Sequence, residues 1–257
     1  MDTLEQDNKI ELGELITIDE PIDKPSFTVY NGETAFAPQG DMIAIKAKPK
    51  NGKTMLSTLL TAVILGAQIG KLHTNNDKQQ HSVIYFDCEQ NRENSKLLIR
   101  RIYALCQWPK TNNEKLNVYN MRTLFPEQRI TAIEEITTQK KPTAIFIDGI
   151  ADLVNDFNDI NECQNVIGKL MKLAQINHTA VFFILHTNKN DNNMKGHLGS
   201  LACQKCTDVM QVEKNNDNSF SAYITETRNE TLDNINFYVN DYGIPIPLQF
   251  NDNDVEQ

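Results

Sequence analysis

Short apolar runs alternate with longer amphipathic stretches along most of the chain. Four runs are apolar without interruption, which is typical of strands that are buried on both faces of a parallel sheet. These four predicted strands cover residues 42–46, 82–87, 143–148 and 180–185. Weaker apolar runs predict two further strands over 27–30 and 116–121. The spacing leaves room for a helix after most of the strands.

Helical periodicity fills several of the intervening segments. The predicted helices cover residues 53–70, 94–106, 126–139 and 162–177. Gly66 and Gly70 are placed to end the first helix, and Pro126 occupies the first turn of the third. Strands that alternate with helices in this way predict an α/β fold with a mainly parallel central sheet flanked by helices.

The last third of the chain has a different pattern. Strands are expected over residues 207–213, 220–227 and 235–239, with short turns between them, so we predict an antiparallel extension on one edge of the sheet. The polar residues 1–25 are expected to form an N-terminal arm, and residues 251–257 a disordered tail. The predicted domain therefore spans residues 26–250.

Composition narrows the class of protein. The chain has 257 residues, of which 40% are hydrophobic, enough for a sizeable core. No apolar run reaches the ~18 residues of a membrane span, and the acidic N-terminus lacks the features of a signal peptide. We therefore expect a cytoplasmic protein with no membrane partner.

Charge and cysteine content narrow it further. The net charge of −9 argues against a broad basic surface for nucleic acid, although a local basic channel in an oligomer stays open. The five cysteines fit a reducing compartment. The lone C-x-x-C at 203–206 lacks the second pair of a zinc ribbon, so two neighbouring helix positions explain it better than a metal site.

Residues 47–54 carry the strongest chemical signal. They read A-K-P-K-N-G-K-T and match the phosphate-binding loop G-x-x-x-x-G-K-[ST], except that Ala47 replaces the first glycine. The match lies between a predicted strand and a predicted helix, the context that this motif requires. The residues expected to bind the nucleotide are Ala47, Lys48, Pro49, Lys50, Asn51, Gly52, Lys53, Thr54 and Met55.

The loop also predicts how ATP and Mg²⁺ are held. The backbone N–H groups and the helix N-terminus form an anion site, with Lys53 reaching the β- and γ-phosphates and Thr54 holding Mg²⁺. A positive φ at Ala47 would strain the loop, because only glycine adopts that conformation freely. The alternative interpretation is a chance match at a turn.

Polar residues follow three of the predicted strands, where ligands bind in open α/β sheets. Asp148 ends an apolar strand and is predicted to hold Mg²⁺, unless it only begins a turn. Glu89 is predicted to be the catalytic base that polarises the attacking water, or else a helix-start carboxylate. His186 is placed to contact the γ-phosphate or its water, or else to bind a backbone group.

Two further sites concern partners. Lys189 and Lys195 flank an Asn-rich loop that is either a nucleic-acid contact or a solvated turn. Arg228 ends the strand predicted over 220–227. It is either a surface charge or, in a ring, an arginine finger for the neighbouring γ-phosphate.

Taken together, these motifs resemble the RecA-like P-loop motor ATPases of the AAA family, in particular the plasmid RepA-type and DnaB-type hexameric helicase cores. Ala47–Thr54 matches Walker A, Ile145–Asp148 matches Walker B, and 83–89 resembles the strand that ends in the catalytic glutamate. Residues 185–189, followed by Gly199-Ser200, resemble the segment H-H-T-x-K then G-S, and 225–229 resembles the strand end K-x-R-N. The resemblance covers roughly residues 30–240.

The resemblance implies an ATPase that forms a hexameric ring and acts as a DNA-associated motor in plasmid or mobile-element replication. It also implies contacts to single-stranded DNA through residues 149–157 and 188–199. Three positions depart from the family pattern, namely Ala47, Leu185 and Glu226. Two other functions stay open: a nucleotide-binding adaptor or switch that does not hydrolyse ATP, and a P-loop small-molecule kinase.

Overall fold

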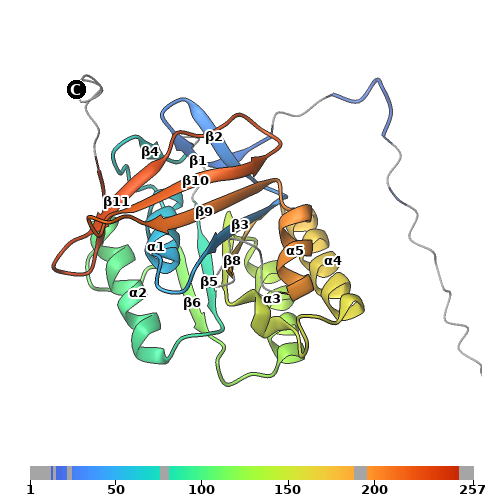
Figure 1. Cartoon of the computed structure of the whole chain (residues 1–257). Helices are drawn as coiled ribbons and strands as arrows, with labels where there is room; N and C mark the ends of the chain where they lie inside the picture. Colours follow the sequence, from blue (N-terminus) through green and yellow to red (C-terminus); the bar gives the residue numbers. More distant parts are fainter. Residues whose placement is uncertain (1–12, 14–15, 22–24, 76–80, 188–195, 249–257) are drawn as a thin grey trace, which may run out of the picture.

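The computed structural model describes residues 13, 16–21, 25–75, 81–187 and 196–248 (Figure 1). Its central feature is a nine-stranded sheet with the strand order β12-β11-β10-β9-β3-β8-β7-β5-β6. A second sheet has three strands in the order β2-β1-β4. The α/β prediction is confirmed, with a mostly parallel sheet between helices and antiparallel strands added at one edge.

The parallel part of the sheet forms the core. Its strands are β3 (Met42–Ala47), β5 (Val83–Asp87), β6 (Leu116–Asn120), β7 (Ala144–Asp148) and β8 (Ala180–His186), and β9 (Asp208–Lys214) also pairs with β3 in parallel. Nearly all residues of β3, β5, β7 and β8 are buried, since helices cover both faces. The carboxyl ends of these strands therefore meet at one edge of the sheet.

Two groups of helices cover the two faces. The helices α1 (Lys53–Ile64) and α2 (Arg92–Leu105) pack on one face, and α3 (Pro126–Lys140), α4 (Ile160–Asn177) and α5 (Gly196–Lys205) lie on the other (Figure 1). A short 3-10 helix, η1 (Ile150–Leu153), follows β7. Each face has its own cluster of buried apolar residues.

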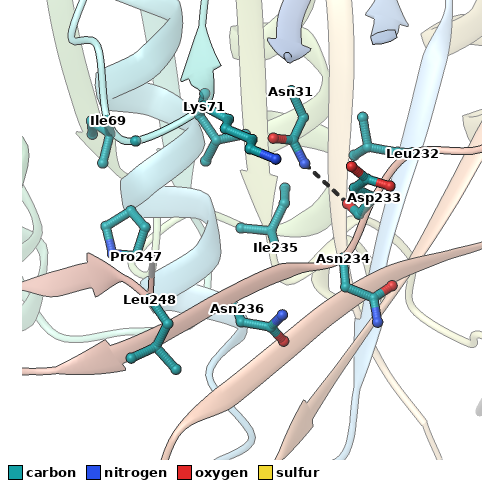
Figure 2. Close-up of a pocket in the computed structure, with 12 residues that line it drawn as sticks. Asn31, Ile69, Lys71, Leu232, Asp233, Asn234, Ile235, Asn236, Pro247 and Leu248 are labelled. Carbon is teal, nitrogen blue, oxygen red and sulfur yellow. Dashed lines mark hydrogen bonds between the residues drawn. The ribbon is translucent and has the colours of Figure 1, made fainter. Parts of the chain in front are cut away.

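The antiparallel extension predicted for the last third of the chain is confirmed. The strand β10 (Phe220–Thr227) pairs with β9 and with β11 (Ile235–Val239), and β11 pairs with β12 (Pro245–Pro247). The small sheet consists of β1 (Phe27–Asn31), β2 (Thr34–Pro38) and β4 (Leu72–His73). The side-chain amide of Asn31 donates to the backbone oxygen of Asp233 at 3.1 Å, beside a cavity of about 650 Å³ between the small sheet and the extension (Figure 2).

Several predicted boundaries and elements are wrong. The helix predicted over 53–70 ends at Ile64, and Gly66 adopts a φ of 102° that a helix cannot contain. The segment predicted as a loop up to Gly199 becomes α5 from Gly196, because the apolar side chains of Leu198 and Ala202 are buried against the core. The strands β2, β4 and β12 are short and depend on pairing with distant segments, so local periodicity did not indicate them.

Candidate nucleotide-binding site

The predicted phosphate-binding loop connects β3 to α1, in the strand–loop–helix setting that the motif requires. Gly52 is the N-cap of α1 with a φ of 86°, and no side chain caps the helix. The N–H groups of the first turn are therefore left for an anion. A Cβ atom on Gly52 would lie 2.5 Å from the ring of Phe220, so the space as well as the backbone conformation requires glycine here.

The backbone at Ala47 is not strained. Ala47 is the last residue of β3 and is not among the described residues with positive φ, whereas Lys50 is, with a φ of 66°. The expected strain at Ala47 is absent because the left-handed turns of this loop fall at Lys50 and Gly52. Replacing the first glycine of the motif therefore has no backbone cost in this structure.

A pocket of about 390 Å³ opens between the loop and the ends of the central strands. Its lining combines one stretch of the loop with the predicted strand-end residues and with two residues from the antiparallel extension. The full set is Lys50, Asn51, Gly52, Lys53, Thr54, Met55, Glu89, Gln90, Asp148, His186, Phe220 and Val239. Of the predicted nucleotide-binding residues, Ala47, Lys48 and Pro49 lie outside this lining, although Ala47 and Lys48 bind Lys53 through their carbonyl oxygens.

Lys53 is buried and bonded to the loop and to β8. Its ammonium donates to the carbonyl oxygens of Ala47 and Lys48, both at 3.3 Å, and to Nδ1 of His186 at 3.1 Å. Burial lowers the pKa of Lys53, and the charges of Asp148 and Glu89 partly offset that effect. The side chain thus crosses the floor of the pocket from α1 to β8.

His186 connects Lys53 to Glu89. Its Nε2 lies 3.2 Å from Oε2 of Glu89, while its Nδ1 faces Lys53. An ammonium can only donate, so Nδ1 accepts and the ring proton of a neutral His186 resides on Nε2, from which it is donated to Glu89. This hydrogen bond is the main cause of a lowered pKa for Glu89, which therefore stays ionised at neutral pH.

Asp148 lies deeper than Glu89, at the end of β7. Its Oδ2 accepts from the hydroxyl of Tyr85 at 3.0 Å and from the side chain of Gln90 at 3.2 Å. Among the described residues no hydrogen bond reaches its Oδ1. Burial, followed by the negative charge of Asp87, raises the pKa of Asp148 to about 6. A buried carboxylate with one free oxygen and a raised pKa is suited to bind a cation.

The sequence did not single out Tyr85, Gln90, Phe220 or Val239 as contributing to the pocket or its support, whereas Asp87 ends the strand predicted over 82–87 and was expected at this edge of the sheet. Tyr85 links Asp148 to Ser57 of α1, with 3.0 Å between the two hydroxyl oxygens. Asp87 is fully buried and accepts from Ser95 at 2.6 Å, which fixes the first turn of α2. Phe220 packs over Gly52 from β10. A tyrosine inside an apolar strand was a usable signal, whereas nothing near Phe220 pointed to the loop.

Arg228 lies away from the pocket of its own chain. Thr227 pairs with Asp208, and Asp208 pairs with Ile43 near the start of β3, so β10 ends at the sheet edge opposite the phosphate-binding loop. Arg228 is exposed there, and its backbone N–H donates to Thr207 at 3.1 Å. Any contact between Arg228 and a nucleotide would have to involve the nucleotide of another subunit.

The predicted DNA-contacting segments are only partly described. Lys189 and Lys195 lie outside the described residues. The segment 149–157 is described and contains Asp152 and Asp156 but no lysine or arginine. Arg129 of α3 holds it through the backbone oxygen of Asp152, with that residue's carboxylate 3.9 Å away.

The structure also bears on the C-x-x-C at 203–206 and on membrane-spanning segments. Cys203 lies in α5 and Cys206 follows its end, and both are free and buried. Within the described segments, no group of three or more His, Cys, Asp or Glu residues is arranged to hold a metal ion on its own. Nor does any helix in these segments have the length and apolar character needed to span a bilayer.

Comparison with known proteins agrees with the geometry. A family model described as an AAA domain matches residues 24–192, about two thirds of the chain. The match includes the phosphate-binding loop, Glu89, Asp148 and His186, and stops before β9–β12 and Arg228. A search of the curated proteins finds no match. The chain therefore belongs to the AAA domain family of P-loop nucleotide-binding ATPases.

Proposed function

We propose that this protein hydrolyses ATP with Mg²⁺ and works as a ring-forming, helicase-like motor on single-stranded DNA in plasmid or mobile-element replication. The observation that carries the ATPase is the chain of contacts from Lys53 through His186 to Glu89, beside Asp148 in one pocket. This set combines a phosphate-binding cation, a general base and a cation ligand in one place.

The residues present fit ATP and Mg²⁺. The uncapped first turn of α1 and the ammonium of Lys53 are positive groups at the pocket floor. The hydroxyl of Thr54 and the free oxygen of Asp148 are hard oxygen ligands that line the same pocket. Mg²⁺ held by them would neutralise charge on the β- and γ-phosphates.

The contacts suggest how the pocket prepares for hydrolysis. Lys53 must exchange some of its present partners, among them His186, to reach a phosphate. His186 would then have Nδ1 free to accept from a water or from a protonated group, while its Nε2 still orients Glu89. Glu89 is ionised and half-exposed, so it can take a proton from the attacking water.

The ring is supported by the position of Arg228. This exposed cation lies at the edge of the sheet opposite its own phosphate-binding loop. An arginine finger acts on the transferring phosphate and can be supplied by a neighbouring subunit. In a head-to-tail ring, each Arg228 would face the pocket of the next chain.

Two alternatives have a different chemistry. A non-hydrolysing adaptor would bind ATP through the same loop and would leave Glu89 without a task. A small-molecule kinase would need an acceptor site and cations on a lid, and among the described residues the pocket lining contains no arginine. The motor explains both Glu89 and Arg228, so it is the function that we propose.

A hydrolysis assay with and without single-stranded DNA separates the three functions. We expect Mg²⁺-dependent release of phosphate that DNA stimulates, together with ATP-dependent assembly measured by size exclusion with light scattering. ATP binding without turnover under all conditions would favour the adaptor. Turnover that depends on a small acceptor would favour the kinase.

Mixing two inactive variants tests the shared site. Arg228→Ala keeps the phosphate-binding loop, and Lys53→Ala keeps the finger, so co-assembly should restore part of the activity at interfaces where each supplies the intact group. A mixture that is shown to co-assemble and stays inactive would contradict the role of Arg228 in the neighbouring site. A protein that stays monomeric with ATP and DNA at high concentration would contradict the ring.

A further inference from the structure

A groove of about 980 Å³ lies along α2 and shares no lining residue with the nucleotide pocket. Its walls come from α2, from the segment that follows α2, and from the turn between β11 and β12. Residues far apart in the sequence thus meet here, with Trp108 and Tyr242 on different walls. No part of the proposed ATPase chemistry uses this groove.

The groove collects positive charge on a protein whose net charge is −9. Lys96 and Arg100 are exposed on one face of α2, one helical turn and about 6 Å apart along the axis, and Lys110 is exposed on the segment after the helix. Among the described residues, none of those lining the groove is acidic. The nearest carboxylate in sequence is Asp241, beside Tyr242 on the turn.

The groove also presents aromatic rings. Tyr242 is 87% exposed, so its ring is open to solvent. Trp108 is partly buried and packs edge-on against Tyr103, with 5.3 Å between ring centroids. The walls are therefore mostly apolar between the cations, with Leu97 also exposed on α2.

The exposed Tyr242 stands on a turn whose backbone is held in place. The side-chain oxygen of Asn240 accepts from the N–H groups of Tyr242 at 3.0 Å and of Ile244 at 2.9 Å. Arg101 of α2 donates to the carbonyl oxygen of Gly243 at 2.8 Å, which ties the turn to the helix. The ring is thus presented to solvent by a fixed backbone rather than by a loose loop.

We propose that this groove binds single-stranded nucleic acid, with phosphates on Lys96, Arg100 and Lys110 and bases stacked on Tyr242 and Trp108. A positively charged groove combined with exposed aromatic faces is the arrangement by which proteins hold single strands without reading sequence. The proposal rests on the nucleic-acid role proposed above and locates a contact for it. The described segment 149–157, with two aspartates and no cation, offers no such set of groups.

The competing occupant is an acidic peptide, for which this chain has a candidate. The described part of its N-terminal arm holds Asp19 and Glu20 beside the exposed Ile16 and Ile18. Apolar anchors of a peptide would need enclosed pockets, whereas Tyr242 offers an open ring face. The single strand therefore fits the groove better.

The groove also has a direct structural link to the nucleotide pocket. The helix α2 begins three residues after Glu89, and its first turn is fixed by the bond from Ser95 to Asp87. A nucleic-acid strand bound along α2 would therefore contact the helix that directly follows Glu89. This connection gives a physical route by which nucleic acid could stimulate hydrolysis.

Direct binding can be measured without reference to ATP turnover, because Trp108 is the only tryptophan in the chain. The probes are fluorescein-labelled oligothymidylate, the matching oligouridylate and a duplex of the same length, followed by anisotropy and by quenching of Trp108. We expect single strands to bind and to quench Trp108, with the duplex binding at least about tenfold more weakly. Comparison of the two oligonucleotides tells whether the natural ligand is DNA or RNA.

Variants assign the binding to the groove. Tyr242→Ala should weaken single-strand binding by about 5- to 100-fold, and Tyr242→Phe should retain it, since the stacking face is kept. Reversing two cations, Arg100→Glu with Lys110→Glu, should reduce the slope of log affinity against log salt by about 1.4, as expected for two lost phosphate contacts on a single strand. Lys169→Glu on the exposed side of α4 reverses one cation elsewhere, half the charge change of the double variant, and should leave both quantities unchanged.

Three results would overturn the inference. The oligonucleotide could bind while the groove variants bind as well as the unmodified protein, which would place nucleic acid elsewhere and leave the proposed motor intact. A synthetic peptide of residues 1–25 could quench Trp108 when no oligonucleotide does, which would assign the groove to the arm. Equal affinity for duplex and single strand would contradict stacking, even if the charge reversals weaken binding. A lack of ATP turnover in the unmodified protein would be a separate result, because it contradicts the proposed function and not the binding of nucleic acid to the groove.

Discussion

The nucleotide pocket and the α2 groove are built on opposite principles. In the pocket, Lys53, His186 and Glu89 are bonded to one another, and Asp148 is buried behind them. In the groove, Lys96, Arg100 and Tyr242 are exposed and contribute little to packing. Changes in the pocket should therefore alter chemistry and stability together, whereas changes in the groove should alter nucleic-acid binding and its effect on turnover but leave stability and basal turnover unchanged.

The largest expected effect is on turnover in the pocket. Glu89→Gln keeps an oxygen that can accept from Nε2 of His186, but the amide cannot take a proton from water. We expect turnover to fall by about 10²- to 10⁴-fold with ATP affinity retained. Phosphate release and isothermal titration measure the two quantities, and equal turnover in both proteins would remove Glu89 from the role of base.

A second pair of changes in the pocket compares how much Lys53 and Lys50 each contribute to ATP affinity. Lys53→Ala removes the buried ammonium, and we expect ATP affinity to fall by about 10- to 100-fold, as for the loss of one strong charge-assisted hydrogen bond. Lys50→Ala is the matched control, because Lys50 lines the same pocket but is exposed. If titration gives equal losses for the two variants, the arrangement of Lys53 is irrelevant to binding.

The positions of the pocket residues could be predicted from the sequence, because they follow from chain contiguity and from the order of parallel strands. The loop 47–54 is contiguous, so its spacing alone specifies the phosphate site. Glu89, Asp148 and His186 come from different strands, yet parallel strands bring their carboxyl ends to one edge. Neither inference needed knowledge of side-chain packing.

The remaining parts depend on long-range pairing that periodicity does not encode. Phe220 reaches the loop only because the register of β10 against β9 places it there. The first turn of α5 was predicted as part of a loop that ends at Gly199, since Gly196 and Gly199 have low helix propensity, and burial of the apolar face of α5 outweighs that preference. The groove joins α2 to a turn about 140 residues later, as the bond from Arg101 to Gly243 shows.

A smaller effect is expected on the free energy of unfolding when Asp148 of the nucleotide pocket is changed. Burial raises the pKa of Asp148 to about 6, so folding favours its protonated form. That stabilisation is complete below about pH 4 and is lost as the pH rises through about 6, which leaves the ionised group costing about 3 kcal/mol at pH 7. Asp148→Asn should recover about 2 to 3 kcal/mol at pH 7, since its amide oxygen can still accept from Tyr85 and Gln90.

Denaturant unfolding without nucleotide at pH 7 and pH 4 checks this prediction. The gain should shrink to about 0.5 kcal/mol at pH 4, where the carboxyl is protonated in the folded state and about half ionised in the unfolded state. Glu135→Gln, an exposed change on α3, serves as the control and should shift stability by less than about 0.5 kcal/mol. A gain of equal size at both pH values would mean that the burial of charge at Asp148 is not its cause.

The smallest effect should come from the groove. Tyr242→Ala removes a ring that is 87% exposed, while the hydrogen bonds of the turn come from Asn240 and Arg101 and survive the change. We expect the free energy of unfolding to stay within about 0.5 kcal/mol and ATP turnover without nucleic acid to stay unchanged. Both are measured on the same preparation that is used for oligonucleotide binding. A large loss of stability would show that Tyr242 supports the fold, and the contrast between a coupled pocket and an independent groove would fail.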